Sequence, residues 1–194
     1  MTDTTTYAPL EKRIQDELFF HRILLLDGEL DDHGGTQLIS QLWVLAKSDP
    51  RKGVQLWINS PGGSVPAMLA IADAMDAVPC TVSTLALGMA ASAGQFLLTA
   101  GDPGHRYALP HSRVLLHQGS AGFGGSAADI ELQAEDLREL IDQVMRITAA
   151  RTGQPFEKVF DDAKRDRWFS AEAAKAYGFL DHVVSDFDQV GAAA

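Results

Sequence analysis

The sequence predicts an α/β fold built on a parallel sheet, and three observations support this prediction. Short apolar runs of strand length alternate with longer stretches whose apolar residues recur at helical spacing. Turn clusters such as Ser60-Pro61-Gly62-Gly63 separate the two kinds of stretch. Strands that are joined through helices pair in parallel, because each helix carries the chain back across the sheet.

The first half of the chain contains the clearest alternation of strands and helices. Residues 1–9 are polar and rich in threonine, so we expect no regular structure before about Pro9. Gly28 and the turn-forming cluster at 31–35 follow the first apolar run. The expected elements are a helix at 10–18, a strand at 22–26, a helix through 38–46, a strand at 54–59, a helix at 65–75 and a strand at 80–87.

The second half adds a strand at 113–117, a glycine-rich segment at 119–125 and a long helix over 127–151. Ser126 can cap that helix, because Asp129 stands at the spacing of a capping box. Its apolar stripe needs a cover, and a second subunit would supply one. The stripe consists of Ile130, Ala134, Leu137, Ile141, Val144 and Thr148. We expect Gly153 to end this long helix, Pro155 to begin a shorter one and Ser170 to begin a final helix.

Composition narrows the class of protein. The 194 residues are 46% hydrophobic and 22% charged, which is typical of one medium-sized globular domain. Sixteen Lys and Arg against 26 Asp and Glu give a net charge of -10, which disfavours nucleic acid and anionic membranes as partners. The single cysteine, Cys80, cannot form an internal disulfide, and no targeting or membrane-spanning segment is visible. We therefore expect a cytoplasmic location.

Three local features could carry chemistry, although each also has a structural explanation. Ser92, in Gly88-Met-Ala-Ala-Ser92-Ala-Gly94, follows a strand and is either an exposed nucleophile or a helix cap. His117 ends an apolar strand and is either a base at the sheet edge or a packed histidine. The glycines of 60–64 either offer free backbone N–H groups to an oxyanion or form an ordinary turn. All three features fall on one edge of the expected sheet, which favours a common site.

Longer blocks of sequence resemble a known family. Asn59-Ser-Pro-Gly-Gly-Ser64, the segments at 88–94 and 112–118, and the segments at 165–172 and 177–181 are similar to the Clp protease proteolytic subunit in order and spacing. The resemblance covers nearly everything after about Leu18. It implies a crotonase-like ClpP fold, with a head domain of alternating strands and helices and a strand–helix handle at about 119–152. Residues 1–18 would form an axial loop and short helix, and residues 19–194 the peptidase domain.

The same resemblance implies an activity and partners. The family is an ATP-dependent serine endopeptidase that cleaves unfolded polypeptides inside two stacked heptameric rings, fed by an AAA+ ATPase unfoldase. Ser92 corresponds to its nucleophile, His117 to its general base and Asp166 to the acid that orients the histidine. The backbone N–H groups of Gly63 and Ala93 correspond to its oxyanion hole. The resemblance implies no metal and no cofactor.

Further residues correspond to binding surfaces of the family. The strand that would bind an extended substrate contains Gly122, Phe123, Gly124 and Gly125. An outer hydrophobic pocket for loops of the ATPase, or simply a packed core, would contain Trp57, Leu87, Tyr107 and Leu109. The contact between rings would include Gln118, Lys164 and Arg165.

The chain departs from the family pattern at three informative positions. Gly119 replaces a proline beside His117, so the backbone there is less restricted. Ala93 replaces a methionine, which preserves the backbone donor but removes bulk. Lys164 replaces an acid beside Arg165, and two adjacent cations would repel an identical ring. A paralogue in the opposite ring, or acids of its own handle helix, could relieve that repulsion.

Two alternative functions remain at this point. A weakly active or regulatory ring subunit that works in a heteromeric complex fits Gly119 and Lys164, but the intact Ser92, His117 and Asp166 argue against it. A crotonase that acts on acyl-CoA thioesters would share the fold. However, such an enzyme is usually longer and has no need of a serine, histidine and aspartate set.

Overall fold

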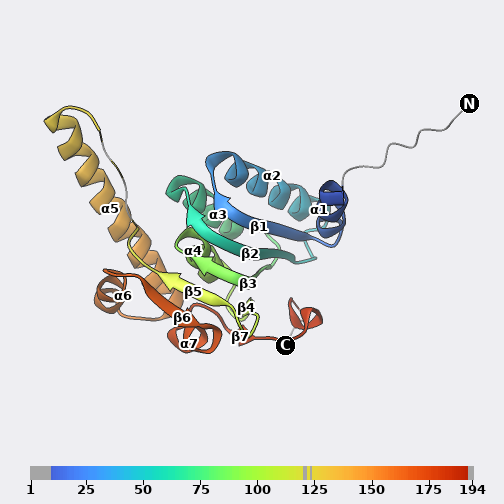
Figure 1. Ribbon diagram of the computed structural model, residues 1–194. Helices are drawn as coiled ribbons and strands as arrows, with labels where there is room; N and C mark the ends of the chain where they lie inside the picture. The colour runs from blue at the N-terminus through green and yellow to red at the C-terminus, as the bar shows by residue number, and fades with distance from the viewer. Residues whose placement is uncertain (1–9, 120–121, 123, 192–194) are drawn as a thin grey trace, which may run out of the picture.

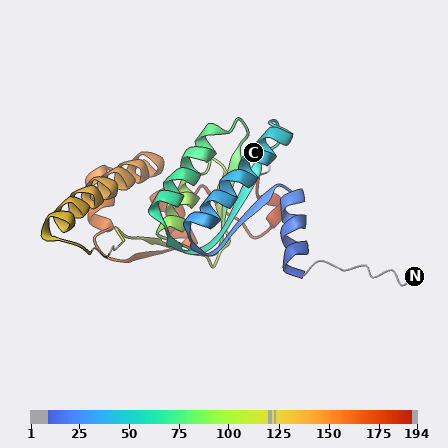
Figure 2. The same cartoon turned by 90° about the horizontal axis from the view of Figure 1, so that it is seen from above.

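The computed structural model describes residues 10–119, 122 and 124–191. A seven-stranded sheet has the order β1-β2-β3-β4-β7, with β5 paired to β3 and β6 paired to β5. Figure 1 shows α5 extending away from the sheet at the end opposite α1, and Figure 2 shows α2 and α3 lying over one face. The strands are β1 (Ile23–Leu30), β2 (Val54–Gly63), β3 (Val82–Ala91), β4 (Arg106–Ala108), β5 (Arg113–Leu116), β6 (Arg167–Ser170) and β7 (His182–Val183).

Helices connect these strands in the expected alternation. They are α1 (Leu10–Phe20), α2 (Asp32–Ser48), α3 (Val65–Ala77), α4 (Ala93–Ala100), α5 (Ala127–Thr152), α6 (Phe156–Asp162) and α7 (Ala171–Tyr177), and a 3-10 turn η1 spans Phe187–Gln189. Within the described residues, no helix is both long enough and apolar enough to cross a membrane. The helices expected from the sequence are confirmed, with ends shifted by a few residues. The division of the chain at residue 18 stays a prediction.

The residues expected at the helix ends act as caps. The Ser126 side chain accepts a hydrogen bond from the Asp129 backbone N–H, and the Asp129 carboxylate accepts one from the Ser126 backbone N–H. Gly153 ends α5 in the left-handed region at φ 70°. Ser170 accepts a hydrogen bond from the Ala173 N–H at the start of α7. Each cap involves residues within three positions of the helix end. The ends of these helices can therefore be predicted from the local sequence.

Parallel pairing is confirmed for most of the sheet but is wrong for one strand. β6 runs antiparallel to β5, with Arg113 opposite Ser170 and Leu116 opposite Arg167. The chain leaves β5, forms α5 and α6, and returns from the same end of the sheet, so β6 must run backwards. The sequence analysis predicted no strand at 167–170, so it did not anticipate this reversal.

Three strands are longer than expected, and the first of them, β1, runs on through Leu30. The segment 60–63, predicted to be a turn, continues β2, and β3 runs on through Ala91. Gly62 and Gly63 stay in the ladder opposite Glu29 and Leu30, at φ 112° and 145°. A Cβ on Gly63 would lie only 2.0 Å from the Leu30 carbonyl oxygen. The glycines therefore allow a close backbone approach rather than ending the strand.

The apolar stripe of α5 is covered by the chain itself along only part of its length. Its C-terminal half packs on the head of the same chain, where Met145 and Thr148 are buried and Val144 contacts the core. The expectation that a second subunit covers the whole stripe is therefore wrong for this half. Near the N-terminal end, Ile130 is 42% exposed and the neighbouring Leu132 is 62% exposed.

The glycine-rich segment 119–125 was expected to be a strand. The structure assigns no strand at its described positions Gly119, Gly122, Gly124 and Gly125. Residues 120, 121 and 123, the last of them Phe123, lie outside the described residues. Strand formation here needs a pairing partner, and in the described chain none of these four positions is paired with another strand.

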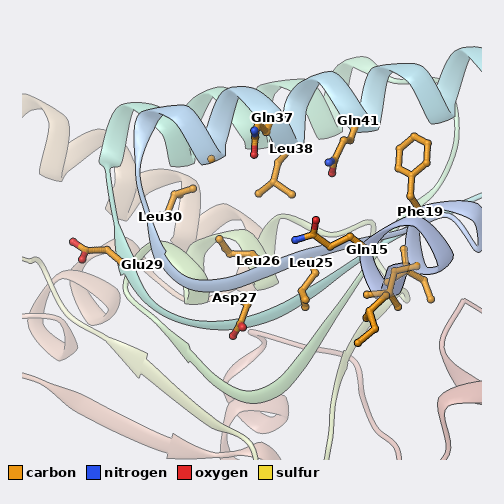
Figure 3. A pocket seen from close by; sticks show the side chains of 14 residues that line it. Gln15, Phe19, Leu25, Leu26, Asp27, Glu29, Leu30, Gln37, Leu38 and Gln41 are labelled. Carbon is orange, nitrogen blue, oxygen red and sulfur yellow. The ribbon is translucent and has the colours of Figure 1, made fainter. Parts of the chain in front are cut away.

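The edge of the sheet beside α1 is hollow. A cavity of about 390 Å³ lies between α1, β1 and α2. Figure 3 shows Phe19 and Gln15 of α1 facing Leu38 and Gln41 of α2 across it. Since β1 is the first strand of the sheet, α1 covers an edge and packs there incompletely.

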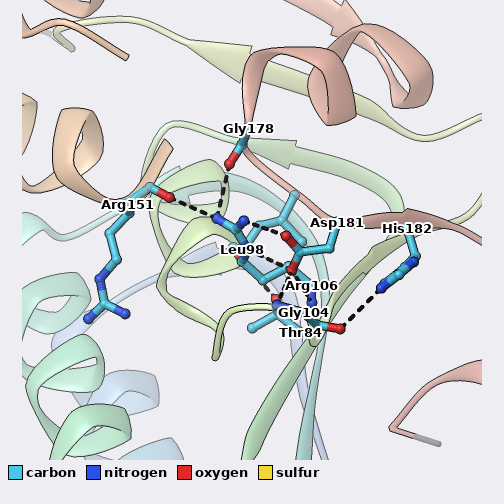
Figure 4. Close-up of polar contacts among 8 residues, drawn as sticks. All are labelled: Thr84, Leu98, Gly104, Arg106, Arg151, Gly178, Asp181 and His182. Atoms are coloured by element: carbon cyan, nitrogen blue, oxygen red, sulfur yellow. Dashed lines mark hydrogen bonds and ion pairs between the residues drawn. The ribbon is translucent and has the colours of Figure 1, made fainter. Parts of the chain in front are cut away.

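A buried arginine joins three elements on the other side of the sheet. Arg106, on β4, is 8% exposed and its Nε donates a hydrogen bond of 2.9 Å to the Asp181 carboxylate. Its guanidinium also donates to the carbonyl oxygens of Arg151 and Gly178, at the ends of α5 and α7 (Figure 4). Burial raises the pKa of Asp181, but the hydrogen bonds and charge of Arg106 outweigh it, so this pKa lies below its usual value.

We expect Asp181→Asn to lower the free energy of unfolding by about 2 kcal/mol at neutral pH, since a charged hydrogen bond is lost. Because the pKa of Asp181 is depressed in the folded state, the wild type gains this stability above about pH 4 and loses it as pH falls further. Urea unfolding at a series of pH values measures the difference. Asp16→Asn, in the exposed pair with Lys12, is the control and should match the wild type. A deficit that does not shrink in acid would contradict the expectation.

Candidate active site

Ser92 occupies a strained turn between β3 and α4. Its backbone has φ 55° and ψ −116°, a conformation that residues other than glycine rarely adopt. The Ser92 N–H donates to the Leu115 carbonyl at 3.1 Å, and the Phe96 N–H donates to the Ser92 carbonyl at 3.0 Å. Although Ser92 stands at the cap position of α4, its hydroxyl makes no cap hydrogen bond. The hydroxyl is thus presented at the tip of a sharp strand-to-helix turn.

Glycines allow this turn to pack directly against the end of β2. A Cβ on Gly62 would lie 2.7 Å from the Ser92 Cβ and 3.2 Å from the Ala93 nitrogen. A Cβ on Gly94 would lie 3.2 Å from the Ser60 carbonyl oxygen. The contact at Gly62 is too close for a side chain, and the contact at Gly94 is tight. The backbones of residues 60–63 and 91–94 therefore pack directly against each other.

His117 and Asp166 meet because β5 and β6 are antiparallel. His117 follows Leu116 and Asp166 precedes Arg167, and these two neighbours are register partners. The His117 Nδ1 lies 3.2 Å from an Asp166 carboxylate oxygen. With the proton on Nδ1, the histidine donates to Asp166 and leaves Nε2 as an acceptor. His117 is 26% exposed and Asp166 is 68% exposed.

Neighbouring contacts hold this pair in place. The Gln118 N–H donates to the Ala163 carbonyl at 2.9 Å, which fixes the backbone after His117. On the other strand, Arg167 forms an ion pair with Asp162. Burial raises the pKa of Asp162, but hydrogen bonds from Lys158 and Tyr177, together with the charge of Arg167, lower this pKa below its usual value. Asp162 therefore remains an anion and ties the end of α6 to β6.

Ser92 and His117 line one cavity of about 380 Å³. The two backbone donors expected for an oxyanion, Gly63 and Ala93, line it as well. Within the described chain, both groups line this cavity but no hydrogen bond joins the Ser92 hydroxyl to His117. Ala93 opens α4, where the helix N-terminus favours negative charge.

The floor of this cavity is apolar and was not expected as a binding surface. Its side chains come from α3, α4 and α5: Val65, Met68, Phe96, Leu137, Leu140, Ile141, Val144 and Met145. Three of them, Leu137, Ile141 and Val144, belong to the stripe that the sequence analysis assigned to a partner subunit. The apolar stripe was the one sequence signal that could have indicated this binding surface. The sequence pattern does not show that the stripe faces Ser92.

Comparisons with known proteins agree with this architecture. Residues 8–187 match the family model described as Clp protease. This chain belongs to the Clp protease family. It is 49% identical over 172 residues to ATP-dependent Clp protease proteolytic subunit 2 of Corynebacterium efficiens, covering 89% of this chain and 86% of that protein. It is 50% identical over 177 residues to subunit 3 of Rhodococcus jostii (91% and 88% covered) and 48% identical over 190 residues to subunit 3 of Streptomyces coelicolor (98% and 88% covered). The resemblance drawn from the motifs is confirmed, and so is the α/β fold of this family.

The four residues that the resemblance predicts to form an ATPase pocket, or a packed core, gather in one place. Tyr107 is buried in a small hydrophobic cluster with Leu85, Val184 and Val190, separate from the main core. Trp57, Leu87 and Leu109 pack against that cluster and are partly buried. Phe187, in η1, stacks on Trp57 with ring centres 5.0 Å apart. The structure thus brings these residues together and covers part of them with its own C-terminal segment.

The residues expected at the contact between rings lie near α6. The Gln118 side chain donates to the Phe160 carbonyl at 3.3 Å. Lys164 is paired with Asp161 at 2.6 Å, so it is not the unpaired cation that the sequence suggested. Arg165 is exposed and has no ion pair among the described residues. Asp161, on α6, pairs with Lys164 within the chain, and the repulsion between identical rings stays a prediction.

We expect Gly62→Ala to slow the reaction of Ser92 with a fluorophosphonate probe by about 100-fold, because the added Cβ displaces the turn by about 1 Å. Gel fluorescence of the labelled protein over time measures the rate. Gly104→Ala is the matched control, since Gly104 also has a positive φ but no atom within 4 Å of the added Cβ. An unchanged labelling rate in a folded Gly62→Ala protein would show that the close packing is dispensable.

Proposed function

We propose that this chain is a proteolytic subunit of an ATP-dependent Clp protease, a serine endopeptidase that cleaves unfolded polypeptides. One observation carries the proposal. Ser92, at a strained turn, lines the same cavity as His117, whose other ring nitrogen faces the Asp166 carboxylate at 3.2 Å. Such a set activates a hydroxyl for attack on a carbonyl carbon. The names of the relatives, all proteolytic subunits, support the same conclusion.

The proposed reaction proceeds in two halves. The His117 Nε2 takes the Ser92 proton as the hydroxyl oxygen attacks the peptide carbonyl, and Asp166 stabilises the imidazolium. The N–H groups of Gly63 and Ala93 donate to the resulting oxyanion. His117 then gives its proton to the leaving amine, which leaves an acyl group on Ser92. Water repeats the sequence and releases the acid, and none of these steps needs a metal ion or cofactor.

The cavity supports a preference for an apolar side chain before the scissile bond. Its floor is formed by aliphatic and aromatic side chains from α3, α4 and α5, which would bury a leucine, methionine or phenylalanine side chain. Gly122, Phe123, Gly124 and Gly125 would pair with the extended substrate backbone. At Gly122 and Gly124 an added Cβ meets no atom within 4 Å, so the backbone there is open to a ligand. Phe123 lies outside the described residues.

We also propose the assembly of the family, two stacked heptameric rings with handles at about 119–152 between them. The exposed Ile130 and Leu132 on α5, and Arg165 beside Asp166, support a contact surface in this region. The several numbered subunits among the relatives support a paralogue as partner. The cluster around Trp57 and Tyr107 is the proposed docking surface for an AAA+ unfoldase. The proposed location is the cytoplasm.

A weakly active subunit that works in a heteromeric complex is the second candidate. The absence, among the described residues, of a hydrogen bond between the Ser92 hydroxyl and His117 supports it. A partner ring would then complete the alignment by covering the exposed Asp166. Fast fluorophosphonate labelling of the protein alone would exclude this candidate, whereas labelling only after a paralogue is added would favour it.

We expect Ser92→Ala to abolish the hydrolysis of a fluorogenic peptide and all fluorophosphonate labelling, because the attacking oxygen is removed. Peptide turnover and intact-protein mass spectrometry measure the two effects. The thermal unfolding midpoint serves as the control and should stay near that of the wild type, since Ser92 makes no side-chain cap bond. Hydrolysis that persists in this variant would refute the proposed nucleophile.

We expect Asp166→Asn to lower the kcat of peptide hydrolysis by about 10⁴-fold, because asparagine favours the wrong histidine tautomer. Steady-state kinetics measure this, with KM changing little. Asp73→Asn is the control, since Asp73 is exposed on α3 and makes no hydrogen bond or ion pair within the described residues. Equal kcat values for the two variants would remove Asp166 from the mechanism.

A further inference from the structure

Glu29 stands beside the proposed oxyanion donors. It is the last residue but one of β1 and pairs with Gly62, while the next residue, Leu30, pairs with Gly63. Strand alternation buries Leu30 and turns Glu29 to the opposite side, where it is exposed. Figure 3 shows its carboxylate pointing away from Gln15 and Leu26. Glu29 also lines the cavity that contains Ser92 and His117.

The charge of Glu29 has no counterpart in that cavity. Among the described residues that line it, Glu29 carries the only carboxylate, and none is a lysine or arginine. Most of the lining is apolar, so few groups nearby oppose its field. The cavity therefore combines an apolar floor with one negative charge at its rim.

Glu29 differs from the other acids at this end of β1 in having no partner. The carboxylates of Asp27 and Asp31 accept hydrogen bonds from the Asn59 amide and the Gly34 N–H. Asp32 accepts one from the Ser64 hydroxyl. The described part of the chain contains no hydrogen bond or ion pair of the Glu29 side chain. Its oxygens are thus available to a ligand in the cavity.

The chemistry of the cavity selects one kind of ligand for Glu29. A metal ion would need several ligands, and the described residues contain no group of three histidine, cysteine or acidic side chains that could hold one. A lysine or arginine side chain fits better, because its aliphatic stem can lie on Val65 while its charge reaches the carboxylate. Since Gly63 is the proposed donor to the scissile carbonyl, that side chain belongs within two residues of the scissile bond.

We propose that Glu29 is a specificity-determining residue that favours substrates with a basic side chain within two residues of the scissile bond. The proposal rests on the peptidase function proposed above and adds a polar preference to the apolar one. It concerns the choice among substrates, while the chemical step stays with Ser92, His117 and Asp166.

Matched fluorogenic peptides test the proposal. All peptides share one sequence with leucine before the scissile bond. For each flanking position, a set of three peptides carries lysine, glutamine or glutamate at that position. We expect the lysine peptide to exceed the glutamine peptide in kcat/KM by about fivefold at the best position, as for a favourable exposed ion pair. Glu29→Gln should bring this ratio to about one, and Glu29→Lys should favour the glutamate peptide. High salt should reduce the ratio in the wild type.

The ratio of the kcat/KM values of the peptides separates a change in selectivity from a general loss of activity. A change that acts through His117 or through folding scales all three peptides alike and leaves the ratio intact. Glu17→Gln, an exposed acid on α1, is the control and should keep the wild-type ratio. A lysine preference that survives unchanged in Glu29→Gln overturns the proposal.

Binding to the Ser92→Ala protein distinguishes failure of this proposal from failure of the peptidase function. Fluorescence anisotropy with the same peptides should give a tighter Kd for the lysine peptide, and Glu29→Gln in that background should remove the difference. If binding follows this pattern while the wild type cleaves nothing, Glu29 selects ligands and the peptidase function is wrong. If cleavage depends on Ser92 but neither binding nor turnover depends on Glu29, the peptidase stands and this proposal falls.

Discussion

The close backbone contact at the end of β2 is the constraint on which the site depends. Gly62 and Gly63 lie between Leu30 of β1 and the turn at Ser92, where a Cβ on either glycine would lie within 2.7 Å of a neighbour's atom. Because no side chain separates these backbones, a proposed oxyanion donor, the serine hydroxyl and the end of β1 border one cavity. The strained φ of Ser92 persists because β2 packs against the turn and β5 accepts a hydrogen bond from the Ser92 N–H.

The histidine and aspartate reach this site by a different route. Their contact depends on the antiparallel register of β5 and β6, which backbone bonds to α6 and the Arg167–Asp162 pair support. A hydrogen bond as exposed as that between His117 and Asp166 contributes little stability, because water competes for both groups. Its alignment therefore follows from the elements that carry it, and these also carry Gln118, Lys164 and Arg165. A contact between rings on those residues would thus act on the geometry of the proposed general base.

Polarity divides the candidate site into two parts. Apolar side chains from three helices form the floor and would give the larger share of binding free energy through burial. The carboxylate of Glu29 stands at the rim, where its charge would add selectivity more than affinity. The helix α5 contributes to both the floor and the proposed handle. Part of the apolar stripe that the sequence analysis assigned to a subunit interface therefore faces the cavity instead. The residues of the stripe that line the cavity are not available to a partner subunit.

Local sequence is enough to predict most helices and strands and the residue types of the candidate site. Helix caps such as Ser126 and Gly153, the alternation of strands and helices, and the spacing of Ser92, His117 and Asp166 can be read from it, because they depend on near neighbours or on long motifs. Three features required the folded chain: β6 runs antiparallel to β5, Gly62 and Gly63 continue β2 opposite β1, and Glu29 faces the cavity of Ser92. Each of these depends on contacts between segments far apart in the chain, and no local preference encodes such contacts.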